Sequence, residues 1–315
     1  MAHRPLRAIG ALSLTTALVV AGGVVSAQSP SAGAVPTLSA SCAKDQLALK
    51  NPGRLTLSTD NPAYSPWWGG DPAIQYPNEP AGGDGWHLGD PYSGEGYEGA
   101  VAYAVAAALG FAPEEVDWVA NAVFEQAFAP GPKPFDFHLA QISIKPERAQ
   151  AVDFSAPYFD SRQALIAMTG TPITKVTTIA GLKDFKLGAG AFTTASQLIE
   201  DVIKPTAEMQ VFNSNADAIQ PLQNGTVDGL ILDVQSALYM RDAQLENYDT
   251  PDPEATVVGQ FDSAAQENQM GMVLEKGSAL TACVNEAIGI VRASGQLQQI
   301  YDQWISTGQE IPTFQ

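Results

Sequence analysis

The sequence predicts a globular protein of the α/β class. Of its 315 residues, 45% are hydrophobic and 16% are charged, a balance typical of a chain with a packed core. Strand-like and helix-like segments alternate after residue 96, which favours largely parallel sheets. The length suits one large domain or two compact ones.

The expected elements follow from hydrophobic patterning. Residues 54–59 alternate as in a strand, and residues 100–109 are apolar on all sides, as in a buried helix. Pro221 falls inside one helical pattern, where it should kink or end the helix. Further strands are expected at residues 116–119, 135–144, 164–168, 187–190 and 227–232, and further helices at 194–203, 216–222, 234–241, 279–293 and 297–306.

The charge balance excludes one class of partner. Sixteen Lys and Arg against 34 Asp and Glu give a net charge of −18. Such a charge repels nucleic acid and anionic lipid, so we expect no nucleic-acid partner.

Residues 1–27 are typical of a secretory signal peptide. Arg4 and Arg7 precede an apolar segment at 9–25, and Val25-Ser26-Ala27 supplies small residues for cleavage. A retained membrane anchor is the alternative. We therefore expect export to the periplasm or the outer face of the cell membrane.

Two cysteines remain after cleavage, Cys42 and Cys283. In an oxidising compartment an isolated pair predicts a disulfide rather than a metal site, which needs more ligands. Lipid modification of Cys42 is an alternative, but Ser39-Ala40-Ser41 lacks the apolar residue expected just upstream. Two unpaired buried thiols are another.

Two segments are expected to lack regular structure. Residues 28–42 form an expected flexible leader, uncharged before Cys42. Residues 69–96 hold eight Gly and four Pro, too many for a helix or strand. The aromatic residues Tyr76, Trp86 and Tyr92 favour an ordered loop, and a loop of this length is usually functional.

Enzyme templates fit the chain poorly. His87 and His138 lack zinc-ligand spacing and lie in no nucleophile-elbow motif, so His138 is expected to be a packed strand residue. The run 188–193 (GAGAFT) begins like a dinucleotide fingerprint, but Thr193 replaces the third glycine. We expect no cofactor, no metal and no catalytic residue.

The same run fits an anion site or an ordinary helix cap. A strand, a Gly turn and Thr193-Thr194 would place backbone N–H groups and a hydroxyl at a helix start. In the segment 135–148, Arg148 follows a predicted strand end. In a chain with few cations it is a candidate carboxylate fork, or else a surface partner of Glu147 or Asp153.

Several motifs in order resemble the polar amino-acid branch of extracellular solute-binding proteins, which serve ATP-driven importers. The most specific are residues 143–149 (SIKPERA) and 152–158 (VDFSAPY). Residues 59–67 (TDNPAYSPW) resemble the first-strand motif of that family. Weaker matches follow at 96–98, 190–194, 224–229 and 297–304.

The resemblance implies a type II periplasmic-binding fold, with two α/β lobes joined by two crossing strands around a ligand cleft. We expect crossings near residues 164–168 and 269–274. Lobe 1 would then comprise residues 43–162 plus 270–315, and lobe 2 residues 163–269.

The resemblance also implies ligand-binding roles. Arg148 matches the clamp on the ligand α-carboxylate, Ser143 a hydroxyl that contacts the same carboxylate or the ammonium, and Asp233 the acceptor of the α-ammonium. Thr194 matches a contact to the ligand carboxylate, and we expect the adjacent Thr193 to line the site with it. Asp60 and Tyr64 match residues near the ligand side chain.

The chain departs from the family pattern at three places. Gln141 stands where a small residue is usual, so it either narrows the pocket or reads a side-chain amide. Lys145 replaces a small hydroxyl residue, and the loop at 69–96 is long. We also expect Trp67 to contact the ligand, although it adjoins Trp68. Such a pair is more often core than a cation cage, which leaves a betaine-like or ectoine-like ligand open.

The sequence thus predicts a monomeric, non-enzymatic exported receptor that delivers a polar amino acid to a membrane permease and its ATPase subunits. The alternative is a dehydratase of the prephenate or arogenate type on the same two-lobe scaffold. Asp60 is its candidate acid–base carboxyl.

Overall fold

The computed structural model describes residues 35–76, 79, 85–121, 123–245, 254–262, 268–306 and 310–315. The expected signal peptide at 1–27 lies outside the described residues. All elements below belong to one contact unit, Val35–Gln315.

A first sheet of five strands has the order β2-β1-β3-β12-β4. Strand β1 (Leu55–Asp60) pairs in parallel with β2 (Val116–Asn121) and with β3 (Phe137–His138). Strand β12 (Val273–Glu275) runs antiparallel to β3 and to β4 (Val152–Phe154). The chain therefore returns to the first sheet from far along the sequence.

Helices α1 (Tyr97–Ala108), α5 (Leu280–Ala293) and α6 (Gln296–Trp304) cover one face of this sheet. Alanine and valine let α1 pack closely, and Ala102, Val105 and Ala106 are fully buried. A smaller apolar cluster containing Ile142, Val152 and Val273 lies in the same lobe. The helices and the second cluster together exclude water from β1 and β3.

A second sheet has the order β10-β6-β9-β7-β8. Strand β7 (Leu187–Gly190) is parallel to β8 (Gln210–Phe212) and β9 (Gly229–Asp233). Strand β6 (Gln163–Met168) is antiparallel to β9 and to β10 (Ala255–Gln260).

Three short helices pack on the second sheet. They are α2 (Thr194–Leu198), α3 (Ile219–Gln223) and α4 (Val234–Tyr239). Helix α2 continues into a π-helical turn at Ile199–Ile203, and α4 into another at Met240–Gln244. Pro221 does not break α3, because it lies in the first turn, where backbone N–H groups have no helical partner.

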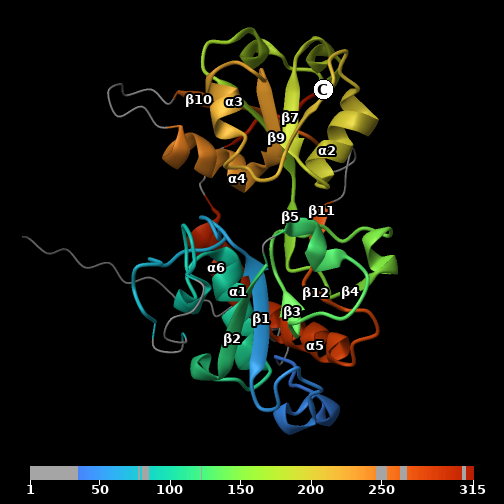
Figure 1. Cartoon of the computed structure of the whole chain (residues 1–315). Helices are drawn as coiled ribbons and strands as arrows, with labels where there is room; N and C mark the ends of the chain where they lie inside the picture. The colour runs from blue at the N-terminus through green and yellow to red at the C-terminus, as the bar shows by residue number, and fades with distance from the viewer. Residues whose placement is uncertain are drawn as a thin grey trace, which may run out of the picture. The chain divides into compact units, whose positions relative to one another are not determined.

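The connection between the sheets differs from the predicted crossings. Strand β5 (Phe159–Ser161) pairs antiparallel with β11 (Asn268–Met270), and this ribbon lies between the two sheets in Figure 1. The predicted first crossing at 164–168 is wrong, because β6 lies inside the second sheet. The second predicted crossing, at residues 269–274, overlaps β11 and continues into β12 of the first sheet.

Two expected boundaries also shift. Residues 313–315 pack on the second sheet rather than the first, since Phe314 contacts Phe261 with ring centroids 4.9 Å apart. Thr313 also forms a bridge with Gln260. Within the expected leader, the Ser39 amide and hydroxyl donate to Glu286 of α5 at 2.8 and 2.9 Å. The other lobe limits stay predictions.

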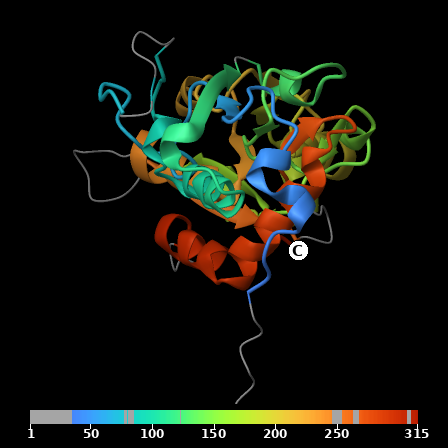
Figure 2. The same cartoon turned by 90° about the horizontal axis from the view of Figure 1, so that it is seen from below.

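The predicted disulfide is confirmed. Cys42 and Cys283 are bonded, which fastens the 3₁₀ turn Ala40–Cys42 to α5. Figure 2 shows this blue segment beside the red helix. In the loop at 69–96, the described part is ordered, because Tyr92 is buried and its hydroxyl accepts from the Trp118 amide at 3.0 Å.

The long strand predicted at 135–144 is wrong. Only Phe137–His138 forms a strand, and Ser143 adds an isolated bridge to Met270. Gln141 has a φ of 53°, which is incompatible with a continuous strand. The segment is rich in apolar residues because residues 135–140, 142 and 143 are buried in an irregular turn.

Candidate functional site

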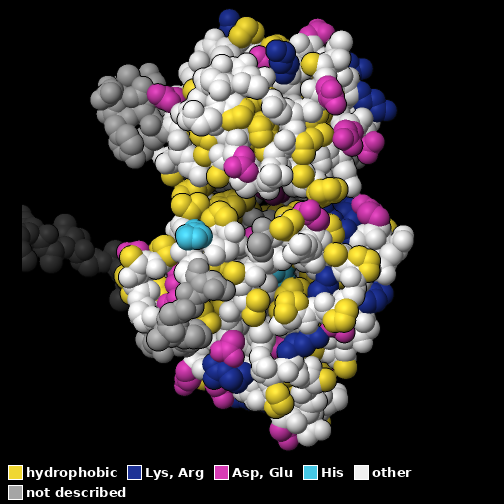
Figure 3. Space-filling view, in the orientation of Figure 1, with side chains coloured by type: hydrophobic (Ala, Val, Ile, Leu, Met, Phe, Trp, Pro, Cys, Tyr) yellow, Lys and Arg dark blue, Asp and Glu magenta, His cyan; other side chains and the backbone are white. Residues whose placement is uncertain are grey.

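A pocket lies where parallel strands of both sheets end. Asp60, Asn121, Gly190 and Asp233 are the last residues of β1, β2, β7 and β9, and all four line it. Its empty space is about 1050 Å³, part of which is open to solvent. Figure 3 shows the hollow, with hydrophobic side chains along its margins. Carboxyl ends of strands are the usual ligand site of open α/β sheets.

Arg148 is the cation of this pocket. Its Nη1 donates to the Ser143 carbonyl oxygen at 3.0 Å, and its Nη2 to the Phe192 carbonyl oxygen at 2.8 Å. The guanidinium also lies 4.3 Å from the Phe128 ring centroid. Burial lowers the pKa of Arg148. Because a guanidinium has five N–H donors, these contacts orient it and leave donors for an anionic ligand.

Asp233 carries one of two negative charges in the lining. Its Oδ1 accepts from Ser161 Oγ at 2.6 Å and from Gln163 Nε2 at 2.8 Å. Burial raises the pKa of Asp233 to about 6, against the lowering effect of these two hydrogen bonds. The register that pairs Gln163 with Asp233 across β6 and β9 brings the two side chains together.

Asp60 carries the other negative charge. Its Oδ1 accepts from Asn121 Nδ2 at 2.8 Å and lies 3.8 Å from Nε2 of His138. Burial raises the pKa of Asp60 to about 7 and lowers that of His138 to about 3. His138 is therefore neutral at physiological pH. It packs in β3 as expected, with Nδ1 2.9 Å from Ser58 Oγ.

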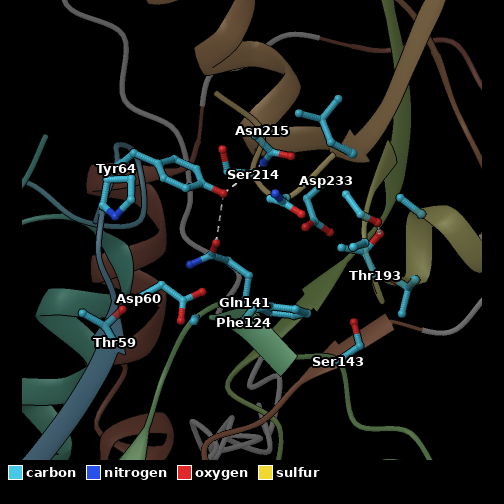
Figure 4. A pocket seen from close by; sticks show the side chains of 18 of the residues that line it. Thr59, Asp60, Tyr64, Phe124, Gln141, Ser143, Thr193, Ser214, Asn215 and Asp233 are labelled. Atoms are coloured by element: carbon cyan, nitrogen blue, oxygen red, sulfur yellow. Dashed lines mark hydrogen bonds between the residues drawn. The ribbon is translucent and has the colours of Figure 1, made fainter. Parts of the chain in front are cut away.

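Gln141 and Tyr64 form one wall of the pocket. The Tyr64 hydroxyl donates to Gln141 Oε1 at 3.4 Å and accepts from Asn215 Nδ2 at 3.0 Å. Figure 4 shows these two hydrogen bonds as dashed lines above Asp60. Tyr64 follows β1 of the first sheet and Asn215 follows β8 of the second sheet. Their hydrogen bond therefore joins the two lobes at the pocket.

The remaining expected hydroxyl residues also line the pocket. Ser143 is 3% exposed, and Thr194 is 5% exposed and accepts from Gln163 Nε2 at 3.2 Å. Thr193 acts as a helix cap, because its Oγ1 accepts from the Ser196 amide at 3.1 Å and donates to the Gly190 carbonyl at 2.8 Å. The capping alternative therefore describes the Thr193 hydroxyl.

Trp67 is not a pocket residue. It is fully buried, and its Nε1 donates to Ser236 Oγ at 3.1 Å. Its ring packs edge-on against Phe159 and Tyr97, with centroids 5.1 and 6.0 Å away. The neighbouring Trp68 lines the pocket instead. The prediction that Trp67 contacts the ligand is therefore wrong, and the alternative that it packs in the core is correct.

Several lining residues were not found from the sequence. Asn121 could have been found, because it lies two residues after the predicted strand at 116–119 and strand ends carry ligand sites. The polar run Asn213-Ser214-Asn215 carries a weaker signal. Gln163 has none, since its position depends on an antiparallel strand pairing. The polar and aromatic lining residues beyond the predicted set include Thr59, Trp68, Asn121, Phe124, Gln163, Asn213, Ser214 and Asn215.

The described residues carry neither a metal cluster nor a membrane-spanning helix. Within the described ranges, no group of three or more His, Cys, Asp or Glu residues could hold a metal ion. In that same part of the chain, no helix is long and apolar enough to cross a membrane.

Curated proteins similar to the chain include two bacterial transport components. The ABC transporter arginine-binding protein 1 of Escherichia coli (strain K12) is 27% identical over 175 residues, 55% of this chain and 67% of that protein. The ABC transporter glutamine-binding protein GlnH of Bacillus subtilis (strain 168) is 29% identical over 171 residues. That segment covers 54% of this chain and 58% of GlnH, less than two thirds of its length.

Solved structures share the fold over most of the chain. An ancestral arginine-binding protein bound to arginine superposes with a TM-score of 0.61 at 23% identity, covering 81% of this chain and 99% of that one. The arginine-, lysine-, histidine-binding protein ArtJ of Geobacillus stearothermophilus gives 0.59 at 25% identity, covering 82% and 96%. The chain has the type II periplasmic-binding fold, as predicted.

The family model for bacterial extracellular solute-binding proteins, family 3, matches residues 88–307. The matched segment contains Arg148 and Asp233, together with the motifs around them. The chain therefore belongs to family 3 of the bacterial extracellular solute-binding proteins.

Proposed function

We propose that the chain is an exported receptor that captures a polar amino acid and delivers it to the permease and ATPase subunits of an ABC importer. The arrangement of charge in the pocket carries this proposal. Arg148, Asp60 and Asp233 are the charged residues of the described lining, and both sheets contribute to it.

A bound amino acid matches this arrangement group by group. Its carboxylate suits Arg148 with the Thr194 region, and its ammonium suits Asp233, whose carboxylate is already oriented by Ser161 and Gln163. Because the site is partly desolvated, each pairing is stronger than in water. Asp60 then remains for the ligand side chain.

The charge sum favours a cationic side chain. Above about pH 7, where both aspartates are ionised, one arginine and two aspartates give the lining a net charge of −1. An amino acid with a positive side chain also has a net charge of +1 and would neutralise the pocket. Two of the similar proteins, the arginine-binding protein 1 and the ancestral arginine-binding protein, are named for a cationic amino acid, whereas GlnH is named for glutamine.

A thermal-shift screen tests the proposal directly. The twenty amino acids, glycine betaine and ectoine are each added to the purified protein, since a ligand of the native state raises the unfolding temperature. We expect L-arginine or L-lysine to give the largest shift. A response to betaine or ectoine but to no α-amino acid would contradict the proposal.

The dehydratase alternative rests on Asp60, whose pKa of about 7 suits an acid–base group near neutral pH. Incubation with prephenate or L-arogenate should give no product, because Asp60 is proposed to bind ligand rather than transfer protons. Product that disappears in Asp60→Asn would support the enzyme instead.

A further inference from the structure

Glu98 is a buried carboxylate that lies behind the pocket wall. It sits in the first turn of α1 and is fully buried. Its Oε1 accepts from the Gln141 amide at 2.7 Å and from the Tyr158 hydroxyl, and its Oε2 accepts from Gln141 Nε2. A carboxylate in such surroundings is tolerated only when donors surround it, and two of the three donors belong to Gln141.

This contact fixes which end of the Gln141 amide faces the pocket. An ionised carboxylate only accepts hydrogen bonds, so the NH₂ group of Gln141 must face Glu98. Its Oε1 consequently faces away, toward the Tyr64 hydroxyl 3.4 Å distant. Asn215 donates to that hydroxyl in turn, so the hydrogen bonds all run in one direction. Reversing the amide would place Oε1 against the carboxylate.

The Gln141 backbone is fixed in the same way. Its φ of 53° lies in the left-handed region, which side chains other than glycine adopt at a cost. The backbone hydrogen bond to Glu98 holds it there. Such a conformation persists where neighbouring contacts over-determine it, and these positions concentrate at ligand sites.

We propose that Glu98 is a positioning residue that sets ligand choice by holding the Gln141 carbonyl oxygen toward the pocket, so that the site selects amino acids whose side chains end in N–H donors. This inference rests on the proposed amino-acid receptor. Gln141 is the residue that touches the ligand, and Glu98 acts through it.

The groups near Gln141 are also hydrogen-bond acceptors. A carbonyl oxygen accepts two hydrogen bonds, and Tyr64 supplies only one to Gln141. The Asp60 carboxylate lines the same pocket as Gln141 (Figure 4). A guanidinium or ammonium would satisfy these acceptors, whereas an apolar side chain would leave them unpaired.

Calorimetry with L-arginine and L-norleucine tests the inference in the full chain. The two probes share their α-groups and differ in side-chain donors. Titrations at about pH 8.5 keep Glu98 ionised, since burial raises its pKa to about 7. We expect Glu98→Gln to lower the arginine-over-norleucine affinity ratio about tenfold, because a neutral amide lets Gln141 adopt either orientation. Norleucine affinity should change by less than about threefold.

Two further variants separate positioning from packing. Gln141→Gly removes the amide and suits the φ of 53°, so it should lower the ratio as much as Glu98→Gln. Adding Glu98→Gln to Gln141→Gly should then lower it no further. Tyr158→Phe is the matched control, because it removes a different donor to Glu98 and leaves the contact to Gln141. It should reduce thermal stability and keep the wild-type ratio.

Each outcome decides the matter. An equal loss of ratio in Tyr158→Phe, or additive losses in the double variant, would show that Glu98 only supports the core. Wild-type protein that binds both probes equally would overturn this inference while leaving the amino-acid receptor intact. Binding of no amino acid at all would overturn both. If Glu98→Gln does not fold, an unchanged ratio in Gln141→Gly overturns the inference alone.

Discussion

Arg148 connects the two lobes through its own hydrogen bonds. Its guanidinium holds the Ser143 carbonyl of the first lobe and the Phe192 carbonyl before α2. These hydrogen bonds orient the guanidinium, so less conformational entropy is lost when it pairs with a ligand carboxylate.

Replacing Arg148 should weaken amino-acid binding strongly. Arg148→Ala leaves a desolvated ligand carboxylate unpaired, which costs about 2–5 kcal/mol, or about 30- to several-thousand-fold in affinity. Arg148→Lys keeps the charge but loses the fork, so its affinity should lie between those of wild type and Ala. Calorimetry with L-arginine measures all three.

Arg162→Ala provides the control, because Arg162 is an exposed arginine outside the pocket lining. It should bind nearly as wild type does. Equal affinity of Arg148→Ala and this control would show that Arg148 does not clamp the carboxylate.

Affinity for a cationic amino acid should depend on pH through Asp60 and Asp233. Their pKa values are raised by burial to about 7 and about 6, and both must be ionised to pair with positive groups. Affinity for L-arginine should therefore fall as the pH drops below about 7, by up to about tenfold per pH unit for each carboxyl. Calorimetry between about pH 8 and 5 measures this. A flat profile would show that neither carboxyl pairs with ligand.

The free protein should show the opposite trend in stability. Because Asp60, Glu98 and Asp233 have raised pKa values, the folded state binds more protons than the unfolded state between about pH 4 and 7. Their contribution is present at low pH and is lost as the pH rises through the folded values. Burial also raises the pKa of Asp90 to about 6 and raises that of Asp136, so both act in the same direction, whereas His138, with its pKa lowered to about 3, opposes them. Urea unfolding at about pH 5.5 and 7.5 should give the higher free energy at the lower pH.

At the scale of elements, the disulfide joins an otherwise small N-terminal turn to α5. It closes a loop over a sequence separation of 241 residues. Cys42→Ser should lower the free energy of unfolding by about 2–5 kcal/mol and the unfolding temperature by about 5–15 °C. Reductant should have a similar effect on wild type and none on the variant. Two free thiols by mass spectrometry of unreduced protein would exclude the bond.

The segment at residues 313–315 stabilises the second sheet. Phe314 is 5% exposed and packs on Phe261 and over Gly259, where a Cβ would lie 2.8 Å from the Phe314 ring. Phe314→Ala should lower the free energy of unfolding by about 3–5 kcal/mol. Denaturant unfolding measures this. Thr313→Ala, at a partly exposed neighbour, should cost much less, and equal costs would contradict the packing argument.

At the scale of the whole molecule, ligand should bias an opening motion about the β5–β11 ribbon. Hydrogen bonds between the lobes include those of Tyr64 with Asn215, of Trp67 with Ser236 and of Arg148 with the Phe192 carbonyl oxygen. Because a ligand held by Arg148 and Asp233 contacts both lobes, it favours the closed state. The radius of gyration from small-angle scattering should fall when L-arginine is added.

Asn215→Ala and Ser236→Ala together remove the side-chain contacts to Tyr64 and Trp67 and should enlarge the free protein. Ligand should then produce a greater decrease than in wild type. Curves that ligand leaves unchanged in both proteins would contradict a hinge.

The sequence alone determined much of this protein. Its family motifs led to the fold, to Arg148 and to Asp233, and its two cysteines led to the disulfide. The strand at 187–190 was predicted with its observed bounds. Local patterns succeed here because buried strands and capped helices leave their marks within a few residues of sequence.

Only the tertiary structure decided the rest. It placed Trp67 in the core, turned the predicted strand at 135–144 into a bend at Gln141, and brought Glu98 behind that bend. It also added Gln163 to the pocket through antiparallel pairing with Asp233. These arrangements join residues tens of positions apart, and their energy comes from burial and hydrogen bonding across elements, which local sequence patterns do not record.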